Sequence, residues 1–195
     1  MQLLHQTISK LKGFKEWFDT LSLHESQLVL GLSGSVKHLA ESCAFEKLDK
    51  QLVIVTPTLL QATQTYEELS EWYDEDIVHL FPVEESLAAD FSVVSPDVVS
   101  QRIRTLDFLS RGEKGIVIVP LSGIQKLLVP AAVWKKSSIE LSMGSEIESM
   151  DAFVEQLVEL GYRRENMVAT PGEFALRGSI VDIYPLDQEY PLRLD

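Results

Sequence analysis

The chain has 195 residues, 45% of them hydrophobic, and a formal net charge of −13 at pH 7. This length allows one large domain or two smaller ones, with enough apolar residues for a buried core. The acidic balance argues against nucleic-acid binding by this chain alone, because that affinity rests on lysines and arginines. The single cysteine, Cys43, excludes an intrachain disulfide. We expect a cytoplasmic protein without a signal peptide or membrane span that docks on other proteins.

Strand and helix patterns alternate along the first two-thirds of the chain. Apolar residues recur at helical spacing from Leu3 to Leu21, which predicts one or two amphipathic helices. We then expect strands at 27–31, 51–55, 77–81 and 115–119, and helices at 35–47, 58–73, 95–110 and 122–128. Thr56 and Pro57 are expected to cap and start the helix at 58–73. Because the strands are nearly continuous runs of Val, Ile and Leu, they predict a parallel sheet covered on both faces.

The pattern changes after Pro130 and predicts a smaller α+β module with an antiparallel sheet. A one-sided strand is expected at 138–142, and a capping box at 145–148 is expected to open a helix that Gly161 stops. Further strand-like segments lie at 167–169, 174–184 and 190–194. We therefore expect two domains, at 1–133 and 134–195. The last predicted strand has no partner after it, which suggests a piece of a longer protein.

The residues after the first predicted strand resemble a phosphate-binding loop of the G-x-x-x-x-G-K-[ST] type that has lost two of its parts. Val36 replaces the second glycine, and its β-branched side chain would block the close approach of a phosphate. His38 replaces the hydroxyl that would hold magnesium, for which an imidazole is a poor ligand. The degenerate nucleotide loop consists of Gly31, Ser33, Gly34, Ser35 and Lys37.

The predicted strands 51–55 and 115–119 also end without the acidic residue that usually supplies a second magnesium ligand. We therefore expect a relic that does not hydrolyse nucleotide, with no cofactor, no metal and no catalytic residue. Two alternatives remain: an ordinary strand-to-helix turn, or a nucleotide-binding domain that still uses Lys37. A hydrolase is disfavoured, because Ser35 stands where the G-x-S-x-G nucleophile motif requires glycine. The four histidines lack the spacing of a zinc site.

The second module carries a basic cluster in an otherwise acidic chain. Arg163, Arg164 and Arg177 lie close in sequence to the aromatic residues Phe174 and Tyr184. Arginine and aromatic side chains are typical of the centre of protein interfaces. The alternative is that each arginine is simply solvated. Two further residues stand out in this segment. Asp182 lies in an apolar run and needs a salt bridge or cap, and Gly178 indicates a bulge or a tight hairpin bend.

The segment Gly172–Pro185 closely resembles the signature G-E-[FY]-A-x-R-G-[GA]-[IL]-[LV]-D-[LI]-[FY]-P of the bacterial transcription-repair coupling factors. It is similar, more loosely, to the excision-repair helicase UvrB. Ser179 is the one departure from the signature. Supporting matches lie at 31–35, 91–92, 95–96, 100–103, 116–120 and 190–195. The resemblance therefore covers nearly the whole chain from about residue 20.

This resemblance implies a RecA-like domain (1A) with a degenerate P-loop, followed by a module like UvrB domain 2. It implies that the module docks onto UvrA and so recruits excision repair to a stalled RNA polymerase. Arg163 and Arg177 match arginines of the UvrA-contacting surface, Tyr184 matches the signature aromatic, and we place Phe174 beside them. The ATP-dependent motor and the sites for RNA polymerase and double-stranded DNA lie downstream in the family, so we expect this segment to be no enzyme. The alternative is a nucleotide-binding domain of a UvrB-like helicase.

Overall fold

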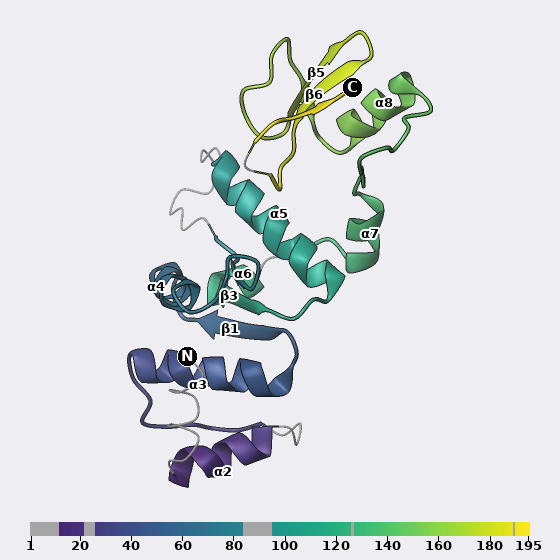
Figure 1. The fold of residues 1–195 in the computed structure, drawn as a ribbon. Helices are drawn as coiled ribbons and strands as arrows, with labels where there is room; N and C mark the ends of the chain where they lie inside the picture. Colours follow the sequence, from purple (N-terminus) through teal and green to yellow (C-terminus); the bar gives the residue numbers. More distant parts are fainter. Residues whose placement is uncertain (1–11, 22–25, 84–94, 126, 189) are drawn as a thin grey trace. The chain divides into compact units, whose positions relative to one another are not determined.

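The computed structural model describes residues 12–21, 26–83, 95–125, 127–188 and 190–195, and the statements below concern these ranges. The chain divides into two compact units, and each is described by itself (Figure 1). Unit 1 consists of Met1–Val83 and Gly112–Lys126, and unit 2 consists of Glu84–Arg111 and Leu127–Asp195. This grouping differs from the linear division expected at 133/134. The division into two domains at 1–133 and 134–195 stays a prediction.

Unit 1 is built on a three-stranded parallel sheet in the order β1-β3-β2. Its strands are β1 (Leu52–Thr56), β2 (Val78–Leu80) and β3 (Ile116–Pro120). Every residue of β3 is buried, because β3 lies in the centre and pairs with both neighbours. Such a run of β-branched residues suits a strand that is covered on both faces. The predicted α/β class with a parallel sheet is confirmed.

Helices α3 (Ser35–Leu48) and α4 (Leu59–Ser70) supply the core on one face of this sheet. Phe45 of α3 and Leu69 of α4 pack with the isoleucines of β1 and β3. Unit 1 also contains α2 (Lys12–Thr20) and the short α6 (Leu121–Ile124). Lys47 of α3 donates a hydrogen bond to the carbonyl of Phe18 in α2. The same ammonium group lies 4.3 Å from the centre of the Phe18 ring, so Lys47 links the two helices.

The strand predicted at 27–31 is not formed. Leu28 and Leu30 are 83% and 79% exposed, and this segment pairs with none of the described strands. An apolar run forms a strand only where a neighbouring backbone offers hydrogen bonds, which composition alone does not reveal. The predicted cap of α4 was also misplaced. Thr58 is the cap, and its hydroxyl oxygen accepts a hydrogen bond from the amide of Gln61 at 3.2 Å, while Thr56 belongs to β1.

Unit 2 contains a four-stranded sheet in the order β4-β5-β6-β7, in which β4 is parallel to β5 and the other pairs are antiparallel. The strands are β4 (Arg163–Arg164), β5 (Glu173–Arg177), β6 (Ile180–Tyr184) and β7 (Leu192–Leu194). The helices are α5 (Pro96–Arg111), α7 (Ala131–Lys136) and α8 (Met150–Glu159). Helix α8 lies beside the β5–β6 hairpin and supplies Phe153 and Leu157 to its core (Figure 1). None of the helices in the described ranges is long and apolar enough to cross a bilayer.

Several boundaries predicted for this unit are wrong. The segments 138–142 and 167–169 form no strand, and α8 begins at Met150 with Ser149 as its cap. The hydroxyl oxygen of Ser145 instead accepts a hydrogen bond from the amide of Ser142 and closes a turn. Ile139 nevertheless packs on the core of unit 2. The alternation of polar and apolar residues at 138–142 therefore reflects the burial of one side chain without strand pairing. Two glycine predictions are confirmed, since Gly161 follows α8 at φ 90° and Gly178 turns the β5–β6 hairpin at φ 67°.

Candidate partner-binding surface

The sheet of unit 2 has two faces of different chemistry. Because side chains alternate along a strand, Phe174 and Leu176 point to one face and Glu173 and Arg177 to the other. The strand pairing extends this alternation across the sheet. The first face packs on α8. We call the second the arginine face, and it consists of Arg163, Glu173, Ala175, Arg177, Ile180, Asp182, Tyr184 and Arg193.

The strand pairing brings together three of the four predicted partner-binding residues. Arg163 lies opposite Glu173, and Glu173 lies opposite Tyr184, so these three form one row across the arginine face. Arg177 lies four residues along β5 on the same face. Phe174 does not belong with them. Its side chain is fully buried in the core of unit 2, so we correct its assignment from partner contact to packing.

Arg193 joins the arginine face through Asp182, which lies opposite it in the pairing of β6 and β7. Its Nε and Nη2 donate hydrogen bonds of 2.6 and 3.0 Å to the two carboxylate oxygens of Asp182. These hydrogen bonds lower the pKa of Asp182, because they stabilise the ionised form. Asp182 therefore has the salt-bridge partner that its apolar run required. Arg193 is not among the residues predicted for this surface, although its alternation with Leu192 and Leu194 could have placed it on this face.

Glu173 holds both Arg163 and a neighbouring loop. One carboxylate oxygen of Glu173 lies 3.8 Å from Nη2 of Arg163. The other oxygen accepts hydrogen bonds of 2.9 Å from the backbone amides of Ala169 and Thr170. The bond from Ala169 is the largest of several contributions that lower the pKa of Glu173. Glu173 is therefore an ionised support for the surface around it.

Arg177 differs from the other two arginines in its partner. Its Nη2 donates a hydrogen bond of 3.2 Å to the backbone carbonyl of Asn166, which carries no net charge. Arg163 and Arg193 instead face carboxylates at 3.8 Å and 2.6 Å. Because the hydrogen-bond partner of Arg177 carries no charge, Arg177 is the side chain of the arginine face best placed to bind a carboxylate of a partner.

The segment predicted to be a degenerate nucleotide loop lies at the start of α3. Gly31 and Gly34 adopt φ angles of 85° and 55°, and Gly34 precedes Ser35, the first residue of the helix. Ser33 and Ser35 are exposed. The ammonium group of Lys37 lies 3.6 Å from Glu41 one turn further along α3. The lysine that would reach a phosphate therefore has an internal carboxylate as its partner.

His38 also turns toward Glu41. Its Nδ1 lies 2.9 Å from the second carboxylate oxygen of Glu41, and its side chain is nearly buried. The exposed side chain of Val36 occupies the position of the missing second glycine. Within the described ranges, no group of three His, Cys, Asp or Glu residues is arranged to hold a metal ion. At the start of α3, Lys37 and His38 therefore both contact the carboxylate of Glu41.

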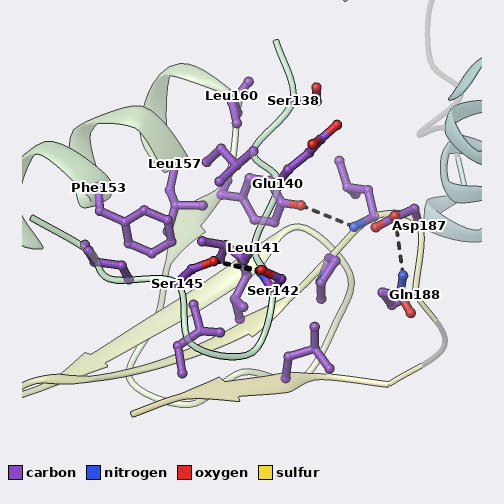
Figure 2. Close-up of a pocket in the computed structure, with 18 of the residues that line it drawn as sticks. Ser138, Glu140, Leu141, Ser142, Ser145, Phe153, Leu157, Leu160, Asp187 and Gln188 are labelled. Carbon is purple, nitrogen blue, oxygen red and sulfur yellow. Dashed lines mark hydrogen bonds between the residues drawn. The ribbon is translucent and has the colours of Figure 1, made fainter. Parts of the chain in front are cut away.

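Unit 2 also contains an open pocket of about 1400 Å³, which extends over the core side of the sheet. Figure 2 shows Phe153 and Leu157 of α8 and Leu141 of the 138–147 segment at this pocket, with Asp187 and Gln188 on its rim. Tyr162 closes part of the wall, since its hydroxyl oxygen accepts a hydrogen bond from the amide of Leu186 at 3.3 Å. Burial raises the pKa of this tyrosine. The residues that line the pocket include no histidine, cysteine or lysine.

Comparison with known proteins identifies a family match within unit 2. Residues 139–195 match the UvrB interaction domain family. This range includes α8, the whole four-stranded sheet and every residue of the arginine face. By this match, residues 139–195 of unit 2 are a UvrB interaction domain.

The relatives extend the match to most of the chain. Transcription-repair-coupling factors are 42% identical over 92% of this chain in Staphylococcus epidermidis and 38% identical over 99% in Staphylococcus haemolyticus. The factor of Bacillus subtilis is 38% identical over 89% of the chain. The chain spans 15% to 16% of the length of these relatives. It belongs to the transcription-repair-coupling factor family, which confirms the resemblance carried by Gly172–Pro185.

Proposed function

We propose that this chain docks onto UvrA through the arginine face and thereby serves transcription-coupled excision repair. The observation that carries the proposal is the shared placement of Arg163, Arg177 and Tyr184 on one side of a UvrB interaction domain. The domain supports UvrA as the kind of partner. The pairing of Arg177 with an uncharged carbonyl supports a carboxylate on the UvrA surface that meets this face.

The docking role needs no catalytic group in this segment. In the longer protein, docking would bring UvrA to a stalled RNA polymerase, while contacts to the polymerase and to double-stranded DNA, and any motor activity, would lie in regions outside this chain. The name of the relatives, transcription-repair-coupling factor, supports this arrangement. We also propose that the protein is located in the cytoplasm.

We further infer that the loop from Gly31 to Lys37 is a nucleotide site that has lost its function. The engagement of Lys37 with Glu41 supports this inference, because the lysine would have to leave its carboxylate to reach a phosphate. A second candidate is residual nucleotide binding by a UvrB-like domain 1A. The positive φ angles of Gly31 and Gly34 favour it, since phosphate-binding loops use such backbone.

The docking proposal is tested by measuring UvrA binding to the purified chain and to two variants, Arg177→Ala and Arg163→Ala. Truncation of an interface hot spot costs about 2 kcal/mol or more, which is about 30-fold in Kd. Arg164→Ala is the matched control, because Arg164 neighbours Arg163 and is exposed but lies opposite Phe174, on the other face. UvrA binding that both face variants leave unchanged would overturn the assignment.

A further inference from the structure

We propose that Met167 is an apolar contact of the UvrA-docking surface, presented by a loop that Glu173 and Arg177 hold in place. This inference rests on the proposed docking function and adds a residue that the sequence signature does not contain. The loop comprises residues 165–172, which connect β4 to β5.

Hydrogen bonds attach this loop to the arginine face at two points. The carbonyl of Asn166 accepts a hydrogen bond of 3.2 Å from Arg177. The amides of Ala169 and Thr170 donate to the carboxylate of Glu173 at 2.9 Å each. Both supporting side chains come from the arginine face. The loop therefore runs out along β5 to Arg177, turns, and comes back to Glu173.

Met167 lies in that turn, between the two points of attachment. Its side chain is 71% exposed. A single exposed apolar residue on a mobile loop needs no explanation. Here, however, the backbone on both sides is fixed by side chains of a proposed binding face, so a partner would lose little loop entropy on contact with Met167. Methionine is enriched in interfaces and adapts its shape to the surface that it meets.

The chemistry of the neighbourhood specifies the complementary surface. Arg177 holds the turn and carries the guanidinium best placed to bind a carboxylate. We infer that UvrA offers an apolar pocket for Met167 beside an acidic residue for Arg177. The carboxylate of Glu173 is a positioning group here, because it is largely covered and its oxygens point to the loop and to Arg163.

The test compares UvrA binding by the unaltered chain and by Met167→Ala, Met143→Ala and Arg177→Ala. Met143 is the matched control, because it is a fully exposed methionine of the same unit and belongs to the 138–147 segment that lines the pocket. We expect Met167→Ala to weaken binding by about fivefold or more, the threshold of an interface contact that matters on truncation. Met143→Ala should leave binding unchanged. Thermal melting of each variant would show that the fold is retained.

The outcomes separate the two proposals. If Arg177→Ala weakens binding while Met167→Ala binds like Met143→Ala, the docking function stands and the role of Met167 is overturned. If the unaltered chain does not bind UvrA, or Arg163→Ala and Arg177→Ala bind undiminished, both proposals are overturned. Glu173→Gln provides the second measurement. It should weaken binding less in a Met167→Ala background than alone, because the loop would no longer present a contact.

Discussion

The carboxylate of Asp182 and the guanidinium of Arg193 form two parallel hydrogen bonds across β6 and β7, at 2.6 and 3.0 Å. This pairing fixes the orientation of Arg193 on the arginine face and explains an acidic residue between Val181 and Ile183. Fork-to-fork geometry of this kind is stronger and more directional than a single ion pair. The pair therefore serves both the register of the last two strands and the shape of the surface.

Asp182→Asn should lower the stability of unit 2 at neutral pH, and the loss should disappear in acid. The pKa of Asp182 is lowered in the folded chain by the hydrogen bonds from Arg193. A group with a depressed pKa stabilises the fold above its ordinary pKa, near 3.9, and this contribution is lost as the pH falls through the folded value. Urea unfolding of the unaltered chain and the variant at pH 7 and at about pH 2.5 measures both differences. A difference that persists undiminished in acid would contradict the assigned cause.

Phe174→Ala should destabilise unit 2, because it removes a side chain of the core and not a surface contact. The ring is 0% exposed and packs with Leu157, Val181 and Ile183. Truncation of a buried phenylalanine typically costs about 3–5 kcal/mol, from lost transfer free energy and the cavity left behind. Phe174→Leu keeps most of the volume and should cost much less. If Phe174→Ala melted like the unaltered chain yet failed to bind UvrA, the ring would belong to the interface after all.

Gly123→Ala should destabilise unit 1 by about 1–3 kcal/mol through overpacking. A Cβ on Gly123 would lie 2.7 Å from Cγ2 of Val119 and 3.3 Å from Cδ1 of Phe81. Gly13→Ala is the matched control, because nothing lies within 4 Å of the added methyl group and Gly13 belongs to α2. The control should be neutral or slightly stabilising, as alanine favours a helix. Equal melting temperatures for the two variants would show that β3 and α6 adjust without cost.

Periodicity predicted those elements whose burial follows from local pattern. The strands of the parallel sheet and helices α3, α4 and α5 lie within a few residues of their predicted positions. The sequence also predicted the bend at Gly178, because a two-residue hairpin turn favours a residue that tolerates positive φ. These elements agree because each strand is a nearly continuous apolar run and each helix has recurring apolar residues over several turns.

The two predicted strands that do not form share one physical cause, which is that strand formation depends on a partner far away in sequence. Residues 27–31 and 138–142 have strand-like composition, but neither pairs with a described strand. The same limit applies to the arginine face. Arg163 and Arg177 could be named from sequence, whereas the contribution of Arg193 depends on the pairing of β6 with β7. The burial of Phe174 follows from strand alternation, which the grouping by interface composition overlooked.

ATP with magnesium should leave the melting temperature of the chain unchanged. A ligand present at 100 times its Kd stabilises the native state by about 2.7 kcal/mol, so functional binding would be plain in a thermal scan. We expect no shift, because Lys37 and His38 both contact Glu41 and Val36 occupies the position of the second glycine.

The control for this experiment separates a lost site from a masked one. Glu41→Gln removes the charge that holds Lys37 at 3.6 Å but leaves the valine and the histidine in place. If the loop is a relic, this variant should also ignore ATP, because phosphate approach and magnesium coordination remain blocked. A rise in melting temperature with ATP that Lys37→Ala abolishes would overturn the relic. A rise seen only in Glu41→Gln would mean that Glu41 masks a site whose backbone still binds phosphate.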